Sequence, residues 1–134
     1  MLGEKFHDIV GKITGTRVIP GDNGPKIEIS FQAAGKLLGI DTTELGTYTS
    51  VMQPSGVFRG EGAGISMSKD GEAVTWQGFG IGRPTGKGLA ASYRYSISYQ
   101  TASPKLARLN NVVGVGEWET DEDGNAKGQS WEWK

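Results

Sequence analysis

Cysteine is absent from this sequence, and His7 is its only histidine. Disulfide frameworks, thiolate zinc sites and cysteine nucleophiles are therefore excluded, and we expect neither a histidine-based triad nor a metal site. The 14 Lys and Arg residues are matched by 15 Asp and Glu, so the formal net charge is only -1. Because no basic excess is available to neutralise phosphates, we do not expect the protein to bind nucleic acid.

Long apolar runs are also missing. No window approaches the ~18 consecutive apolar residues that a membrane span needs. The opening Met-Leu-Gly-Glu-Lys-Phe-His-Asp is charged from the start, unlike a secretory signal peptide. These absences predict a cytoplasmic protein without a membrane partner.

Glycine, by contrast, supplies 22 of the 134 residues, about twice its usual share. So much glycine disfavours long helices, and it lacks the strict three-residue period of collagen. A chain of this length has room for one hydrophobic core, so residues 1–134 are expected to form a single domain.

Turn residues divide the chain into short segments. The strongest breaker is Pro20-Gly21-Asp22-Asn23-Gly24-Pro25, and the Asp-Gly pairs at 70–71 and 123–124 are typical of hairpins. The segments between the turns are rich in Val, Ile, Thr, Tyr and Trp, which favour strands. The predicted strands cover residues 5–18, 26–34, 43–52, 57–68, 73–82, 89–100, 111–120 and 126–133. One short helix is predicted over 103–109, capped by Ser103 and with Pro104 at its first position.

The strand count predicts the fold class. Eight antiparallel strands in one domain leave exposed sheet edges unless the sheet closes on itself. We therefore expect an all-β fold, an eight-stranded antiparallel closed β-barrel with one short helical turn. The interior of such a barrel is just wide enough to be filled by side chains or to hold one small ligand.

Period-2 alternation separates the two faces of several strands. Tyr93, Tyr95, Ile97 and Tyr99 share one face of their strand, opposite small polar residues. Two neighbouring strands carry a glycine at every second position, at 60, 62 and 64 and at 78, 80 and 82. A face without side chains lets a strand coil sharply or lets large rings such as Trp76 lie across it, and both favour a tightly curved barrel.

The glycine runs do not indicate a nucleotide site. A dinucleotide fingerprint has the spacing G-x-G-x-x-G and opens a helix, whereas the spacing here is G-x-G-x-G within strands. We expect no organic cofactor and no metal.

Candidate site residues are polar or aromatic and have two interpretations each. Arg59 and Glu61 share a strand face, so they form either a polar pair inside the barrel or a solvated outer pair. Glu117 is either an acid or base at the barrel mouth or a surface charge. His7 is either a general base or a solvated residue near the chain terminus. The ring set Tyr93, Tyr95, Tyr99 and Trp76 either lines a ligand pocket or fills the core. The expected catalytic residues are Glu61, Arg59 and Tyr95, and the expected ligand-binding residues are Tyr99, Tyr93, Trp76 and Glu117.

The segment from Ser103 to Glu119 reads as a short helical turn, a small loop and the Gly-x-Gly strand Gly114-Val115-Gly116. This passage resembles the late part of the allene oxide cyclase barrel superfamily. It also resembles the dirigent proteins and a group of small bacterial barrels. The resemblance implies an eight-stranded barrel, commonly oligomeric, with an apolar cavity open at one end. The catalytic residues of the plant members have no matching motif in this chain, so the resemblance does not imply an enzyme activity.

The favoured function is the binding of a compact apolar or aromatic molecule inside the barrel, with or without a cofactor-free isomerase or cyclase activity. The alternatives are a non-catalytic carrier resembling lipocalins and a filled structural or assembly barrel. Apolar residues such as Val57, Ile65 and Met67 lie opposite the glycine face, so we also expect a homo-oligomer that buries them.

Overall fold

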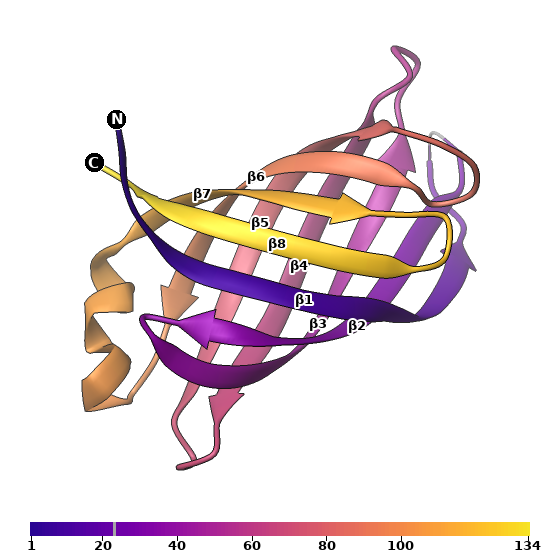
Figure 1. The fold of residues 1–134 in the computed structure, drawn as a ribbon. Coiled ribbons are helices and arrows are strands. Elements are labelled where there is room, and N and C mark those ends of the chain that lie inside the picture. The colour runs from indigo at the N-terminus through magenta and orange to yellow at the C-terminus, as the bar shows by residue number, and fades with distance from the viewer. Residues whose placement is uncertain (23) are drawn as a thin grey trace.

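Eight strands follow one another around a closed barrel, and each pairs antiparallel with the next in the chain (Figure 1). The computed structural model describes residues 1–22 and 24–134. The strands are β1 (Leu2–Ile19), β2 (Lys26–Leu37), β3 (Ile40–Met52), β4 (Phe58–Ser68), β5 (Ala73–Pro84), β6 (Ala91–Gln100), β7 (Val113–Thr120) and β8 (Asn125–Trp133). The all-β fold class and the closed eight-stranded barrel expected from the sequence are confirmed. No helix among these residues is long and apolar enough to cross a membrane.

Closure is achieved by pairing β1 with β8. The register of this pair shifts twice, between Leu2 and Lys5 and between Lys5 and His7. Such irregularities bend a strand and re-aim its side chains. Here the neighbouring residues Phe6 and His7 are both buried, although strict alternation would place one of them outside.

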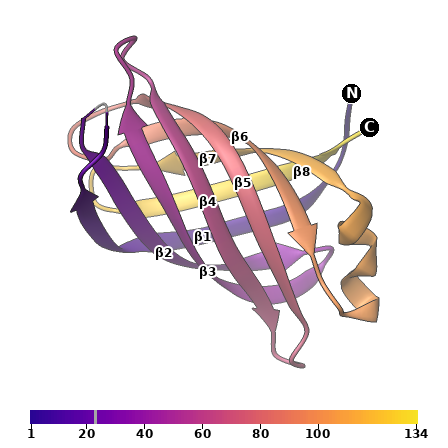
Figure 2. The same ribbon diagram turned by 180° about the vertical axis from the view of Figure 1, so that it is seen from behind.

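The predicted helix is present as a short 3-10 helix, η1 (Pro104–Asn111). Pro104 starts it as expected, but the Ser103 side chain makes no capping hydrogen bond. Leu106 and Leu109 are fully buried and belong to the same core as the barrel interior. η1 and both chain termini lie at the same end of the barrel (Figures 1 and 2).

The predicted turns join the strands as expected at 70–71 and 123–124. Gly71 and Gly124 have φ values of 85° and 82°, a left-handed conformation that glycine adopts at little cost. The turn predicted at residues 20–25 lies between β1 and β2, and its residue 23 is outside the described part of the chain.

The glycines at alternate positions of β4 and β5 point into the barrel, where aromatic rings take the space their side chains would occupy. A Cβ on Gly64 would come within 2.5 Å of the Trp76 ring, and one on Gly82 within 2.5 Å of the Tyr93 ring. A Cβ on Gly116 would likewise overlap with the Tyr95 ring. The expectation that large rings lie across the glycine face is therefore confirmed.

We predict that Gly64→Ala destabilises the barrel. The added methyl group has no space beside the Trp76 ring and the Leu45 carbonyl oxygen, and overpacking of this kind costs about 1–3 kcal/mol. Urea denaturation would measure the loss. Gly15→Ala is the matched control, since a methyl group on Gly15 would have no atom within 4 Å, and a substitution there that costs as much would contradict the explanation.

Candidate functional site

The structure divides the expected site residues between the two faces of the barrel wall. Tyr93 and Tyr99 are buried inside, Tyr95 is inside and partly buried, and Trp76 is 9% exposed. Each of these residues therefore belongs to the barrel interior, as expected.

Arg59 and Glu61 lie on the outer face, so of their two interpretations the interior polar pair is wrong and the outer position is correct. Period-2 alternation explains this, because the inward positions of β4 belong to Gly60, Gly62 and Gly64. The Arg59 guanidinium lies 5.1 Å from the centre of the Phe79 ring, on the neighbouring strand. Glu61 borders the interior cavity between two glycines, but the residue is exposed.

Glu117 also lies on the outer face of its strand, so of its two interpretations the position at the barrel mouth is wrong and the surface charge is correct. The inward neighbours on β7 are Gly116 and Trp118, both buried. The Glu117 carboxylate is 3.8 Å from an Arg94 guanidinium nitrogen on the outer surface. This pair is solvent-exposed and contributes little to stability.

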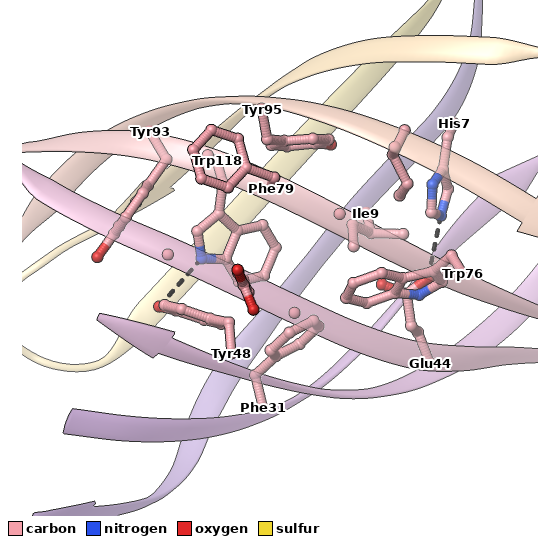
Figure 3. A pocket seen from close by; sticks show the side chains of 16 residues that line it. His7, Ile9, Phe31, Glu44, Tyr48, Trp76, Phe79, Tyr93, Tyr95 and Trp118 are labelled. Carbon is pink, nitrogen blue, oxygen red and sulfur yellow. Dashed lines mark hydrogen bonds and ion pairs between the residues drawn. The ribbon is translucent and has the colours of Figure 1, made fainter. Parts of the chain in front are cut away.

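A cavity of about 80 Å³ lies within the barrel. Its wall is predominantly apolar and combines aromatic rings with the bare backbone of the β4 and β5 glycines. The lining residues extend from Tyr93 and Tyr48 at one end to His7 and Glu44 at the other (Figure 3). The rest of the interior is filled by rings, such as the close pair Phe31 and Trp118, whose centres are 4.6 Å apart.

His7 and Glu44 form a buried pair that the sequence patterns do not reveal. His7 is 4% exposed and Glu44 is 3% exposed, so the expectation of a solvated histidine is wrong. The imidazole Nε2 is 3.2 Å from Glu44 Oε1, an ion-pair distance, although the ring N–H is not aligned for a hydrogen bond. The same oxygen accepts a 2.5 Å hydrogen bond from Ser66 Oγ. Oε2 has no hydrogen-bond partner among the described residues.

The other side of the imidazole contacts a phenol. His7 Nδ1 is 3.1 Å from the Tyr99 hydroxyl. Burial raises the pKa of Tyr99 well above its usual value, so this hydroxyl keeps its proton at neutral pH. Tyr99 can therefore donate to Nδ1, and the Nε2 atom on the other side of the ring faces Glu44.

Each remaining tyrosine hydroxyl has a partner. Tyr95 lies 2.6 Å from Ser130 Oγ, Tyr93 lies 2.9 Å from Ser50 Oγ, and Tyr48 accepts a 3.2 Å hydrogen bond from Trp118 Nε1. Burial raises the pKa of Tyr95 to about 12 and raises the pKa values of Tyr48 and Tyr93 as well.

Trp76 contributes a polar atom without a partner. Its Nε1 is buried and makes no hydrogen bond with the described residues. An unpaired buried donor costs free energy, and Trp76 lines the same cavity as His7 and Glu44. The cavity therefore has an apolar wall with a donor and a carboxylate at one end.

The titratable groups of the site are not arranged as metal ligands. In the described part of the chain, no three His, Cys, Asp or Glu side chains are placed to hold a metal ion. The chemistry that this arrangement offers is proton transfer, to a buried carboxylate and from a phenol, both of which border the cavity.

Because the tyrosines are buried, we predict that they ionise at a higher pH in the folded protein than in the unfolded chain. A raised folded-state pKa stabilises the fold below the unfolded value of ~10, and for Tyr95 that contribution is lost as the pH rises toward about 12. We expect all four tyrosines to stay un-ionised at pH 10 in the folded protein. Tyrosinate absorbance would follow the ionisation and circular dichroism the unfolding. Ionisation at pH 10 of a protein that remains folded would contradict the burial argument.

Comparisons with known proteins show the fold. No family model matches the chain, and no curated protein matches it. A protein with unknown function from Clostridium acetobutylicum is 18% identical, with 98% of each chain covered and a TM-score of 0.80. A conserved protein of unknown function from Rhodopseudomonas palustris is 16% identical, with 99% of each chain covered and a TM-score of 0.81. A beta-barrel like protein from Acinetobacter baumannii is 16% identical, covering 100% of this chain and 96% of its own, with a TM-score of 0.79. At these identities the similarity extends to the barrel architecture alone, and the expected allene oxide cyclase-like family is not confirmed.

Proposed function

We propose that the barrel interior binds a compact, largely apolar small molecule and that the protein is a cofactor-independent isomerase. The observation that carries this proposal is the His7–Glu44 pair, buried at one end of an apolar cavity. A buried carboxylate and imidazole are costly to a fold, and apolar residues of similar volume often serve stability as well or better. Such a pair beside a cavity is a candidate for acid–base function.

The cavity volume limits the ligand. At about 80 Å³ the cavity is well below the ~300 Å³ of ordinary ligand pockets and about half the ~150 Å³ that admits benzene in an engineered cavity. A short molecule of few heavy atoms fits better than a fused ring. The volume supports isomerisation of a small substrate over cyclisation of a long one, and it argues against a lipocalin-like carrier.

A filled structural barrel is the second candidate function. The specific observation in its favour is the extent of ring packing. Phe31 packs against the rings of Tyr48, Trp76 and Trp118, and Tyr48 also packs against Trp118. Under this alternative the cavity is a packing defect, and the polar end holds at most an ordered water.

Binding of a small neutral ketone tests the two candidates. We expect butanone to bind with a Kd on the order of 1 mM, seen by ligand-observed NMR, and to raise the melting temperature. Acetophenone is too large for the cavity and should not bind.

The control for this experiment is a variant with a smaller cavity. Gly78 lines the cavity, and a Cβ there would stand 3.0 Å from the Ser96 carbonyl oxygen, so Gly78→Ala adds a methyl group at a modest packing cost. Butanone affinity should fall for Gly78→Ala but not for Gly15→Ala. Equal binding by both variants, or no binding by the native protein, would favour the structural candidate.

We also propose that the protein forms a homo-oligomer through the outer face of β3, β4 and β5. Leu45 is 46% exposed and pairs with Ile65 on the neighbouring strand, and Met67 lies on the same face. Ile65 and Met67 are partly buried in the single chain. Arg59 and Glu61 are the charged side chains of β4 on this face, and both lie toward one end of the strand, which leaves an apolar area suited to a second copy.

Sedimentation velocity tests this association. We expect a species heavier than 14.3 kDa at micromolar concentration, and we expect Ile65→Lys to shift it to the monomer because the charge would be buried in the contact. Val10→Lys is the control, since Val10 is 66% exposed and lies on β1. A native monomer would rule the oligomer out.

A further inference from the structure

Two groups capable of proton transfer face the same cavity from separate parts of the wall. Glu44 comes from β3 and Tyr95 from β6, and both line the cavity. In a ring of eight strands, β3 and β6 are three positions apart, so their inward side chains approach each other across the interior. Figure 3 shows Glu44 and Tyr95 on different sides of the cavity.

The carboxylate is held so that one oxygen stays available. Ser66 Oγ and His7 Nε2 both approach Oε1, at 2.5 and 3.2 Å. His7 is in turn fixed by the Tyr99 hydroxyl at its other nitrogen. Oε2 is then free to accept a proton from a molecule in the cavity.

The phenol is held in the same manner. Ser130 Oγ lies 2.6 Å from the Tyr95 hydroxyl, and this hydroxyl donates a 3.3 Å hydrogen bond to the Gln129 carbonyl oxygen. When Ser130 donates to the phenol oxygen, the phenol proton can leave its long hydrogen bond to the Gln129 carbonyl oxygen and turn to a ligand. Because burial raises the pKa of Tyr95 to about 12, the group remains an acid at neutral pH.

The unpaired Trp76 Nε1 indicates what the ligand presents. An N–H group can only donate, so its missing partner is a hydrogen-bond acceptor. The buried carboxylate disfavours an anionic ligand, since two like charges at low dielectric repel strongly. A neutral oxygen acceptor, such as a carbonyl group, satisfies both conditions.

We propose that the substrate is a small neutral β,γ-unsaturated carbonyl compound, in which the carbon between the carbonyl group and the C=C bond carries an acidic hydrogen, and that Glu44 and Tyr95 are the catalytic base and acid of its isomerisation. This inference rests on the proposed function. Trp76 and Tyr95 bind the carbonyl oxygen, and Glu44 Oε2 faces the C–H bond. His7, Ser66, Tyr99 and Ser130 are positioning residues.

The proton transfers balance without a co-reactant. Glu44 takes the proton from the carbon next to the carbonyl, and the C–H electron pair forms a new C=C bond. The C=O π electrons move to the oxygen, which takes the Tyr95 proton. With the C=C bond already present in the substrate, the result is a dienol. The Glu44 carboxylic acid then returns its proton to the far carbon of the dienol. The dienol hydroxyl returns its proton to Tyr95, which restores both groups and leaves a conjugated carbonyl product.

The experiment uses 4-penten-2-one as the probe, and NMR follows its conversion to 3-penten-2-one at neutral pH. We expect the native protein to accelerate conversion over buffer. Glu44→Gln should lower the rate at least ~100-fold, the lower end of the usual range of general acid–base contributions, and Tyr95→Phe should lower it at least ~10-fold, because Trp76 still binds the carbonyl oxygen. Circular dichroism would establish that each variant is folded, and Tyr95→Phe serves as the test if Glu44→Gln is not.

Two buried serines, each in contact with a tyrosine hydroxyl, provide a matched test of whether Ser130 positions Tyr95. Ser130 contacts Tyr95 and Ser50 contacts Tyr93, and neither serine lines the cavity. Ser130→Ala should lower the conversion rate about 10-fold while the butanone Kd stays constant. Ser50→Ala should change the rate less than 2-fold.

The outcomes separate this inference from the proposed function. If butanone binds but 4-penten-2-one is not converted faster than in buffer, or is converted equally by Glu44→Gln, the acid–base assignment is overturned while binding stands. If butanone does not bind at all, both are overturned.

Discussion

The narrow interior of an eight-stranded barrel is the constraint on which the rest of this structure depends. Such an interior is just wide enough to be filled by side chains, yet this chain places large rings there from several strands. Glycine resolves the conflict, because the inward positions of β4 and β5 carry no side chain for much of their length. The Trp76 and Tyr93 rings lie where those side chains would be. The alternate glycines of β4 and β5 therefore account for both the curved wall and the ring-filled core.

The polar end of the cavity is the second organising feature. A carboxylate that is 3% exposed must be compensated by nearby donors. Ser66 on β4 and His7 on β1 approach it from different strands, and Tyr99 on β6 holds the imidazole. The network therefore joins four strands around the end of the barrel where η1 packs. Its members support one another, and loss of any one would leave a buried polar atom without a partner.

The similarity to the Clostridium, Rhodopseudomonas and Acinetobacter proteins extends over nearly the whole of each chain. It fixes the architecture at low sequence identity, and architecture alone does not assign a function. The groups of this chain that bear on a function lie in the barrel interior. Glu61 and Glu117 carry their charges on the outer face of the barrel, in solvent. Glu44, by contrast, is the one carboxylate among the described residues that is buried, and it lies against the cavity.

Local sequence signals determined the barrel. Asp-Gly turns, β-branched and aromatic segments and alternate glycines are short-range patterns, and they predicted eight strands, one short helix and an inward tyrosine face on β6.

The same signals placed the polar site at the wrong residues. On β3 the apolar Leu45 faces outward and Glu44 inward, so alternation alone suggests the opposite orientation. His7 lies next to a register shift that buries two consecutive residues, and no local sequence pattern predicts this shift. The other members of its network, Glu44, Ser66 and Tyr99, lie on three other strands far along the chain, and only closure of the barrel brings them together.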